Sequence, residues 1–349
     1  MKRIGYLYDK AFSKETIRKA INEAARNKRH RRQVRHILAN ADKFVDVVYE
    51  MMQNRTFVPS AYTKDTTSDP IKKKVRNIFK PRFFPDQIIH WCIYIVIRDN
   101  IYKSLIKQTC ASIKGRGQLY GIKIVQKWMK NDRKGTKYYL KIDIHHYYPS
   151  VNNDTLISFL ERKIKDKEFL ELIKNILILE PGLPIGMLLS QIFANFYLSN
   201  FDHKVLEQKD VEHYIRYNDD IVAFSSNKKK LHKLRKDFVQ MLGELDLHMK
   251  PNWQVCKTDS EPLDFMGYRI NHEKLIIRKK VMYRVTARGR RFYKNPNFHN
   301  ASAVVSDFGW IKHTMSWNLF DKWLRPYVNY KKAKNIIRRK QKNVKNISK

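Results

Sequence analysis

The sequence predicts an α+β fold in which helices pack behind a mainly antiparallel sheet. Residues 137–144, KYYLKIDI, alternate between apolar and polar side chains as a half-buried strand does. Residues 213–226, HYIRYNDDIVAFSS, hold two strand-like runs around an Asn218-Asp219 turn, which is a hairpin pattern. Helical patterns separate and follow these strands. The expected order is therefore strand, helix, helix, hairpin, helix and further strands.

The N-terminal part of the chain is expected to be mostly helical. Residues 1–60 form a basic helical region, in which RNKRHRRQVR favours phosphate contact over a merely solvated helix face. Residues 61–85 are rich in Pro, Lys and Thr, so we expect extended, loop-like structure there. A strongly apolar helix follows at 86–102, and a glycine-punctuated loop then enters a helix within 110–130.

The segments after the first strand alternate in the same way. Helices are expected at 155–179, 188–206 and 228–246, where apolar residues recur at spacings of three and four. Strands return within 248–255, 263–270 and 274–280. The last 75 or so residues become helical and basic, and the segment from 331 to 349 contains no acid. We interpret that tail as a cationic arm for nucleic acid.

Composition restricts the class of partner. The 349 residues suit two or three subdomains, and their formal charge is +38, from 71 basic and 33 acidic residues. Charge of this size indicates a polyanionic partner, with nucleic acid favoured over an anionic membrane surface. No apolar run approaches the length of a membrane span, and the N-terminus lacks a signal-peptide core. The three cysteines lie far apart, which favours core thiols and a cytoplasmic location.

Three aspartates stand out because acids are scarce and these lie in apolar strands. Asp143 ends the strand at 137–144, and Asp219 with Asp220 occupies the hairpin turn. Any one of them alone is explained by ordinary turn chemistry. If the two strands are neighbours, however, three carboxylates converge and require a positive charge among them. Carboxylate oxygens suit Mg²⁺, and two such ions would serve an in-line phosphoryl displacement.

Four motifs in order give these aspartates a context. LKIDIHHYYPSV, LPIGMLLSQIFANFYL, YNDD and LDFMGYRI follow one another between residues 70 and 270. In sequence and order they resemble the palm motifs of the reverse transcriptase family. The resemblance implies a right-hand polymerase architecture: mainly fingers at 61–142, mainly palm at 143–270, and thumb with a basic tail at 271–349. The basic helical region 1–60 precedes the fingers.

The resemblance also implies residue roles. Asp143 and Asp219 would bind both metals, with the Ile144 carbonyl as an extra ligand and Asp220 adjusting the pair. The site would use Mg²⁺, with Mn²⁺ as a substitute. Tyr148 matches the aromatic that packs beneath the sugar and excludes a 2′-hydroxyl. The remaining nucleotide-binding positions would be Lys74, Arg76 and Arg116 for the triphosphate, together with Ile185, Gly186 and Gln191. Primer and template contacts would come from Tyr217, Asn218, Met266, Gly267 and Tyr268.

The second motif indicates a subtype. Ile185 stands where many relatives carry Gln, and the pattern IGxxxSQ resembles reverse transcriptases of diversity-generating retroelements, which copy RNA with errors opposite adenine. An apolar side chain offers no hydrogen bond to the nascent pair, so mispairs lose less relative to correct pairs. SDFGWIKHTMSWNLF resembles the thumb of that group, whereas Asn218 departs from its usual Met. Partners implied are template RNA, a cDNA or primer, dNTPs and a small basic helical accessory protein that is oligomeric.

Two other functions stay open at this point. An antiphage-defence or retron-like reverse transcriptase would share the chemistry but copy a dedicated noncoding RNA. A non-catalytic RNA-binding protein on the same fold belongs to a different class. The intact Asp143, Asp219 and Asp220 count against it, because a binder has no use for clustered acids beside phosphates.

Overall fold

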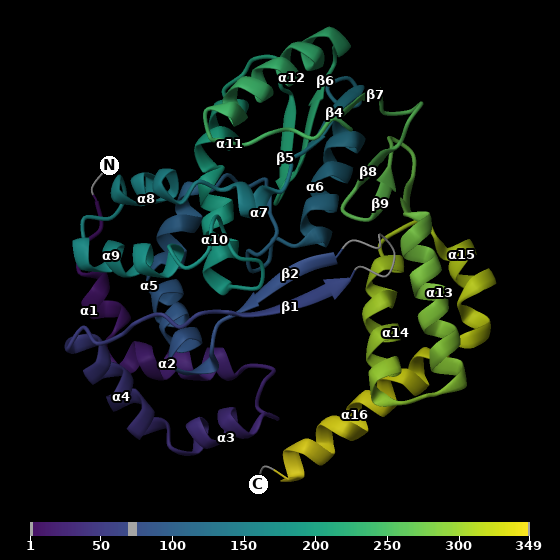
Figure 1. The fold of residues 1–349 in the computed structure, drawn as a ribbon. Helices are drawn as coiled ribbons and strands as arrows, with labels where there is room; N and C mark the ends of the chain where they lie inside the picture. The colour runs from purple at the N-terminus through teal and green to yellow at the C-terminus, as the bar shows by residue number, and fades with distance from the viewer. Residues whose placement is uncertain (1–2, 69–74, 348–349) are drawn as a thin grey trace.

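The computed structural model describes residues 3–68 and 75–347, with the last helix described by its backbone alone after residue 340. Figure 1 shows a central sheet with helices around it, and the C-terminal helices to one side. The described part of the chain has no helix that is both long enough and apolar enough to cross a membrane.

The N-terminal region is helical, as the sequence predicts. Its elements are α1 (Leu7–Ala11), α2 (Lys14–Ala25), α3 (Arg32–Ala39) and α4 (Ala41–Gln53). Helix α2 begins where the Ser13 hydroxyl accepts from the Thr16 amide, and it buries Ile17 and Ile21. This apolar face packs on α5 (Ile88–Ser104), which the short helix η1 (Phe83–Gln87) precedes.

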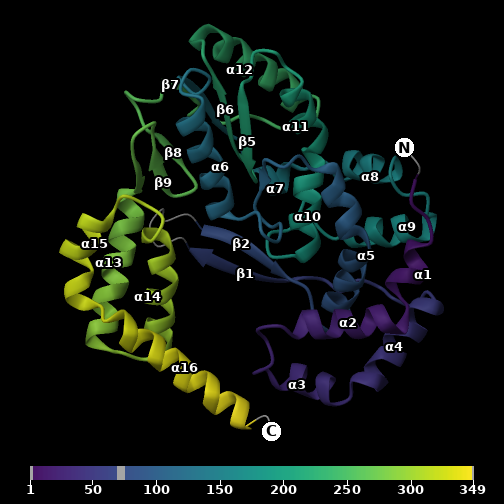
Figure 2. The ribbon, with the colours of Figure 1, turned by 180° about the vertical axis from the view of Figure 1, so that it is seen from behind.

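A hairpin replaces the loop expected at 61–85. Strand β1 (Thr63–Ser68) pairs antiparallel with β2 (Val75–Lys80), from Thr63 opposite Lys80 to Ser68 opposite Val75. The prediction of extended structure is correct, but that of a loop is wrong. The strands carry mostly exposed residues and bury no complete face, so the alternating apolar pattern that reveals a strand is missing. In Figures 1 and 2 the hairpin extends from the N-terminal half toward the C-terminal helices.

The central sheet has five strands in the order β3-β5-β6-β4-β7. The strands are β3 (Thr109–Cys110), β4 (Tyr138–Asp143), β5 (His213–Tyr217), β6 (Asp220–Ser225) and β7 (Gln254–Lys257). Strand β6 pairs antiparallel with both β4 and β5, which confirms the predicted strand and hairpin. Alternation sends Leu140 and Ile221 into one core and Tyr139 and Phe224 into another, on opposite faces.

Helices cover both faces of this sheet. The helices of this part of the chain are α6 (Gln118–Asn131), α7 (Tyr147–Ser150), α8 (Asn153–Glu161), α9 (Lys167–Leu177), α10 (Leu188–Tyr197), α11 (Ser199–Leu206) and α12 (Lys228–Gly243). Helix α6 contacts β5, and α12 contacts β4, β6 and β7 (Figure 2).

Two helices expected to be continuous are each divided. The segment 155–179 breaks between α8 and α9, where residues 163–165 bond to the backbone of Ile4 and Asp166 caps α9. The segment 188–206 divides at Leu198, between α10 and α11. In the first case a contact from a distant segment ends the helix, which the apolar periodicity of 155–179 does not reveal.

The C-terminal part begins with a small sheet of β8 (Leu263–Phe265), β9 (Tyr268–Ile270) and β10 (Leu275–Ile277), in the order β10-β9-β8. The single strand expected at 263–270 is thus a hairpin, because Met266 and Gly267 have φ of 50° and 89° and turn the chain.

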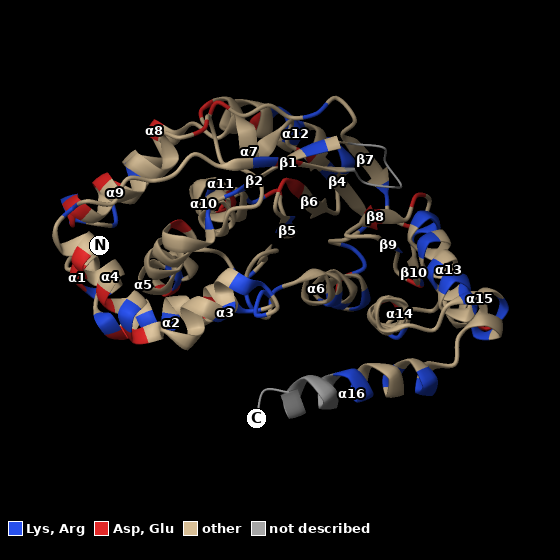
Figure 3. Ribbon diagram, turned by 60° about the horizontal axis from the view of Figure 1, so that its bottom comes forward, with Lys and Arg blue, Asp and Glu red and all other residues tan. Residues whose placement is uncertain are grey.

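The final helices are α13 (Lys279–Lys294), α14 (Phe298–Ile311), α15 (Trp317–Trp323), η2 (Arg325–Tyr327) and α16 (Tyr330–Ile347). They form a third hydrophobic cluster of their own, around residues such as Val285, Phe292 and Val304. Lys and Arg follow α13 and the described part of α16 (Figure 3). The predicted helical and basic character of this region is confirmed.

Candidate active site

The three aspartates meet at one end of the β4–β6 pair. Asp143 is the last residue of β4 and lies directly opposite Asp220, the first residue of β6. Asp219 occupies the turn between β5 and β6, and its carbonyl oxygen accepts a hydrogen bond of 3.1 Å from the Ile144 amide. Cross-strand neighbours have Cβ atoms about 5 Å apart, so the Asp143 and Asp220 carboxylates share one small volume.

Burial makes this cluster electrostatically unfavourable as it stands. Burial raises the pKa of Asp219, and the Asp143 carboxylate raises it further. Burial also raises the pKa of Asp220 to about 7, against an opposing effect of Lys141. One oxygen of Asp220, Oδ1, is buried without a hydrogen-bond partner. Carboxylates with raised pKa values and unused oxygens are the surroundings in which a cation gains most.

Lysines lie beside two of these acids. The Lys250 ammonium bonds to Asp143 Oδ1, and the Lys141 ammonium is 3.9 Å from Asp220 Oδ1. Within the described residues, no three His, Cys, Asp or Glu side chains form a ready metal cage. The donor chemistry nevertheless fits Mg²⁺, because hard carboxylate oxygens are present and magnesium sites in such enzymes use one or two of them.

Tyr148 lies next to these acids. Burial raises the pKa of its hydroxyl to about 12, and the Asp219 carboxylate adds to the rise. Its carbonyl oxygen accepts a bond of 2.8 Å from the Leu183 amide. Gly182 has φ +68°, and a Cβ there would collide with the Pro149 carbonyl. This close approach places the loop that carries Ile185 against the backbone of Tyr148.

The same loop contacts the β1–β2 hairpin. The Ile185 carbonyl accepts a bond of 2.7 Å from the Phe79 amide in β2. Gly186 has φ +110°, and a Cβ on it would lie 2.7 Å from the Phe79 carbonyl oxygen. Ile185 is half-buried and Gln191 is exposed on α10. The loop is therefore held between β2 on one side and Tyr148 on the other.

The predicted triphosphate residues differ in their placement. Arg76 is exposed on β2, and its charge acts to lower the pKa of Asp219. Arg116 instead donates to the Ile106 carbonyl at 3.0 Å, and in the described structure it forms no ion pair with the three aspartates. Lys74 lies outside the described residues.

The predicted primer and template residues fall into two groups. Tyr217 pairs with Asp220 across the turn, and Asn218 adopts φ +54° with its buried Oδ1 lacking a hydrogen-bond partner. Met266 and Tyr268 have buried side chains, and the Tyr268 ring packs on Trp310 with centroids 5.2 Å apart. Gly267 lies between them, and the Trp310 ring packs so closely on it that a Cβ at this position would be 2.6 Å from the ring.

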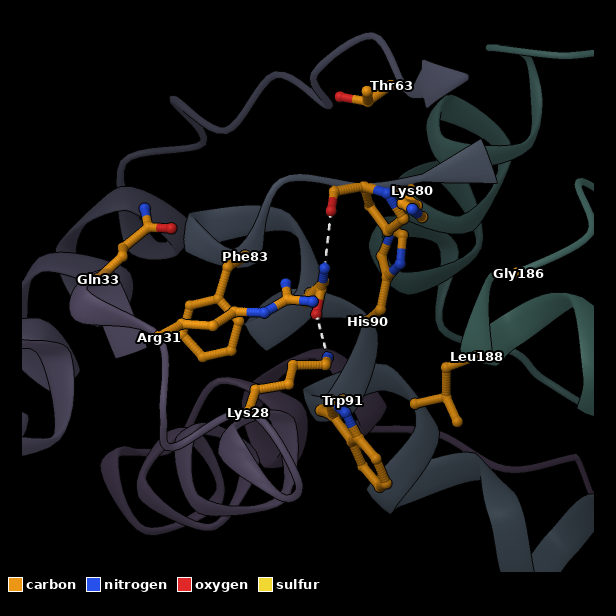
Figure 4. A pocket seen from close by; sticks show the side chains of 12 residues that line it. Lys28, Arg31, Gln33, Thr63, Lys80, Phe83, His90, Trp91, Gly186 and Leu188 are labelled. Atoms are coloured by element: carbon orange, nitrogen blue, oxygen red, sulfur yellow. Dashed lines mark hydrogen bonds between the residues drawn. The ribbon is translucent and has the colours of Figure 1, made fainter. Parts of the chain in front are cut away.

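A cavity of about 400 Å³ borders the loop at Gly186 and Leu188. Its other walls come from the N-terminal helices, β2 and α5, and Figure 4 shows Lys28 bonded to Gln87 there. The His90 ring rises from α5 toward β2 at Lys80. Burial lowers the pKa of His90 to about 4, so the ring is neutral, and its Nε2 has no hydrogen-bond partner.

Several of these neighbours were not expected from the sequence. Nothing in the sequence marked Lys250 and Lys141 as site residues, because single lysines are common in so basic a chain. The buried pair of Asp202 and Arg216, both 0% exposed, was also missed: Arg216 is a charged residue in the middle of the strand-like run HYIRY, whereas Asp202 lies among other polar residues of α11.

Comparisons with known proteins agree with this geometry. The family model for "Reverse transcriptase (RNA-dependent DNA polymerase)" matches residues 93–270. The chain is similar to the retron Ec73 reverse transcriptase of Escherichia coli, with 25% identity over 256 residues, 65% of this chain and 77% of that enzyme. It is also similar to the group II intron-encoded protein LtrA of Lactococcus lactis subsp. cremoris, with 23% identity over 180 residues, 48% of this chain and 29% of LtrA.

The comparison with solved structures finds telomerase chains at low sequence identity. Telomerase from Candida albicans in complex with a telomeric RNA fragment gives a TM-score of 0.49 at 10% identity, covering 77% of this chain and 57% of that one. Apo telomerase from Candida tropicalis, truncated at its C-terminal domain, gives 0.47 at 14% identity, covering 65% and 58%. This chain thus spans just over half of each telomerase chain. Because the family model covers more than half of this chain and includes all three aspartates, the chain belongs to the reverse transcriptase family of RNA-dependent DNA polymerases.

Proposed function

We propose that this chain synthesises cDNA on an RNA template by nucleotidyl transfer at Asp143, Asp219 and Asp220. The observation that carries the proposal is the meeting of the three carboxylates at one end of β4 and β6. Two Mg²⁺ ions, or Mn²⁺ in their place, would stabilise charge on the attacking and leaving oxygens when bound. Asp143 and Asp219 would hold them, with the Ile144 carbonyl as a further ligand.

Neighbouring side chains would position the nucleotide. Tyr148, beside Asp219, would pack beneath the sugar and exclude a 2′-hydroxyl. Arg76, exposed on β2 and with a charge that lowers the pKa of Asp219, would pair with triphosphate oxygens, for which a guanidinium fork is suited. The cations of α13 and of the cavity near Gly186 support binding of the template strand.

Primer extension with purified protein, an RNA template, dNTPs and Mg²⁺ tests this proposal. Asp219→Asn should lower the rate by at least about 100-fold, because it removes a charge from the reacting centre. Asp154→Asn is the matched control, since Asp154 is an exposed acid in the first turn of α8. Equal synthesis by Asp219→Asn and by the control would rule out the metal-site assignment.

The proposed subtype is a diversity-generating enzyme that makes frequent errors opposite template adenine, aided by a small basic helical accessory protein. Ile185 supports it: the half-buried apolar side chain lies on a loop held by β2 and Tyr148. Ile185→Gln should lower misincorporation opposite adenine, and Ile178→Gln, at a residue 76% exposed, is the control. An unchanged error spectrum in Ile185→Gln would contradict this assignment.

A retron-like role, or a related role in defence, is the second candidate, and the similarity to the retron Ec73 enzyme favours it. Such an enzyme would copy a dedicated noncoding RNA. Sequencing the cDNA that copurifies with the protein from its own cells separates the two roles. Copies of a repeat with substitutions confined to adenines support diversification, whereas one faithful product of a noncoding RNA supports the second candidate.

A further inference from the structure

A buried ion pair lies beneath the turn that carries Asp219 and Asp220. Arg216 and Asp202 are both 0% exposed, and Arg216 is the largest fully buried side chain among the described residues. Arg216 Nε donates to Asp202 Oδ1 at 2.8 Å, and Nη2 donates to Oδ2 at 2.7 Å. This bidentate geometry fixes the guanidinium plane. A buried ion pair is weak evidence for a stabilising role, so its other contacts indicate its purpose.

The remaining donors of Arg216 reach the turn and a neighbouring helix. Nη1 donates to the Asn218 carbonyl at 3.1 Å, and Nη2 donates to the Asn195 carbonyl in α10 at 3.1 Å. Asn218 adopts φ +54°, a left-handed conformation that side-chain-bearing residues adopt at a cost. The bond from a charged donor offsets that cost and selects this turn over alternatives.

Asp202 is itself held by groups from other elements. It accepts from the Thr109 hydroxyl at 3.0 Å and from the Tyr214 hydroxyl at 2.6 Å. Asn195, which Arg216 contacts, donates to the Ala111 carbonyl at 3.0 Å. The bonds to Asp202 and Asn195 therefore hold the guanidinium in one position, independently of the turn. It acts as a fixed point on the β3, β5 and α10 side of the site.

The other side of the turn is fixed by β4. The Asp219 carbonyl accepts from the Ile144 amide at 3.1 Å, next to Asp143. Two successive peptide carbonyls, of Asn218 and Asp219, are thus bound by different segments: the first by Arg216 in β5 and the second by the Ile144 amide directly after β4. Losing either bond would free the peptide groups that orient the Asp219 and Asp220 carboxylates toward Asp143.

We propose that Arg216 is a positioning residue, which sets the orientation of Asp219 and Asp220 through its bond to the Asn218 carbonyl. The proposal rests on the function proposed above, because it assigns a purpose to Arg216 only if those carboxylates act in synthesis. Arg216 touches neither substrate nor metal. Its effect should therefore fall on the turnover number and on the magnesium requirement, rather than on the binding of template and primer.

Two variants separate positioning from folding. Arg216→Lys keeps a buried cation for Asp202, but one ammonium does not reproduce the bidentate fork and also reach the Asn218 carbonyl. Arg216→Met/Asp202→Leu removes both charges together, which avoids leaving one charge buried alone. Arg55→Met/Glu168→Leu is the control, because it removes an ion pair that joins Arg55, just after α4, to Glu168 in α9, away from the turn.

The experiment measures kcat, the KM for template–primer, and the half-saturating Mg²⁺ concentration, each normalised to the folded fraction. Both Arg216 variants should lose at least tenfold in kcat, need more Mg²⁺, and keep KM within about twofold, while the control keeps all three values. If the double variant fails to fold, Arg216→Lys decides alone. Unchanged kcat and Mg²⁺ requirement in a folded Arg216 variant would overturn the proposal.

Asp219→Asn, assayed in parallel, distinguishes failure of the proposed function from failure of the positioning role of Arg216. If Asp219→Asn still synthesises DNA, the proposed function itself fails. If Asp219→Asn is inactive while both folded Arg216 variants are fully active, only the positioning role of Arg216 fails.

Discussion

Two pairs of an aspartate with a basic residue lie at the central sheet, and their surroundings are opposite. Asp202 and Arg216 are 0% exposed and are bound by hydroxyl and carbonyl groups from several elements. Asp143 and Lys250 are 33% and 26% exposed at the end of β4. The Asp202–Arg216 pair is thus buried in the interior, whereas the chemically similar Asp143–Lys250 pair is partly exposed to solvent.

This difference in burial indicates in which pair another cation can replace the basic side chain. Around Asp202 both carboxylate oxygens are already engaged by Arg216, and neither side chain is exposed to water. At Asp143 the partner is a single ammonium on a flexible stem, within reach of solvent. We infer that the first pair is a permanent support, whereas the second holds the place of a cation that changes during function.

The sharpest test of this contrast is thermodynamic. Asp202→Asn should lower the free energy of unfolding by about 3–5 kcal/mol, because it leaves the Arg216 charge buried without a counter-charge. Lys250→Met should change it by less than about 1 kcal/mol, as expected for a partly exposed pair. Urea unfolding followed by circular dichroism measures both values. Similar losses in the two variants would show that the pairs do not differ as proposed.

Local patterns in the sequence were enough to predict the elements that carry the acids. The alternation in 137–144 and the hairpin at 213–226 are confirmed, because each strand has one pattern of inward and outward residues. The convergence of Asp143 with Asp219 and Asp220 followed from assuming that these strands are neighbours, and the register bears this out. The roles of the individual site residues stay predictions.

Contacts between distant segments were beyond such patterns. Lys250 meets Asp143 across 107 positions, and no periodicity links them. The β1–β2 hairpin lacks an apolar face, and the break after α8 comes from contact with Ile4. β8 and β9 fold into a hairpin that buries the side chains of Met266 and Tyr268, and the expected place of these residues at the primer stays a prediction. Each of these features depends on tertiary packing rather than on local sequence.

His90 is a buried ionisable side chain without an ionic partner among the described residues, and it should have a smaller effect on the free energy of unfolding. Its ring is 2% exposed and unpaired at Nε2, and burial lowers its pKa to about 4 from an ordinary value of 6.5. The unfolded chain therefore binds a proton between pH 6.5 and 4 that the folded chain does not. Stability contributed by neutral His90 is present above pH 6.5 and falls by roughly 3 kcal/mol as the pH drops to 4.

The variant His90→Phe isolates this effect, because it keeps a buried ring and removes the titration. Urea midpoints of both proteins, measured from pH 7 to pH 4, should fall more steeply for the original chain. Parallel curves would show that His90 is protonated as readily in the folded protein as in the unfolded one. Unlike the charge of Arg216, a charge on His90 would have no counter-charge in its cavity, which is lined by Lys28, Arg31 and Lys80.

The smallest expected effect tests whether Lys250 is replaceable. If its ammonium competes with Mg²⁺ for Asp143, Lys250→Met should lower the half-saturating Mg²⁺ concentration about fivefold, the equivalent of roughly 1 kcal/mol. Primer extension across a magnesium series measures it, with Lys230→Met as the control, since Lys230 pairs with Asp210 away from the three aspartates. A higher half-saturating Mg²⁺ concentration in Lys250→Met would mean that Lys250 assists the metal-loaded site. The two pairs would then differ in burial but not in whether their basic residue is replaceable.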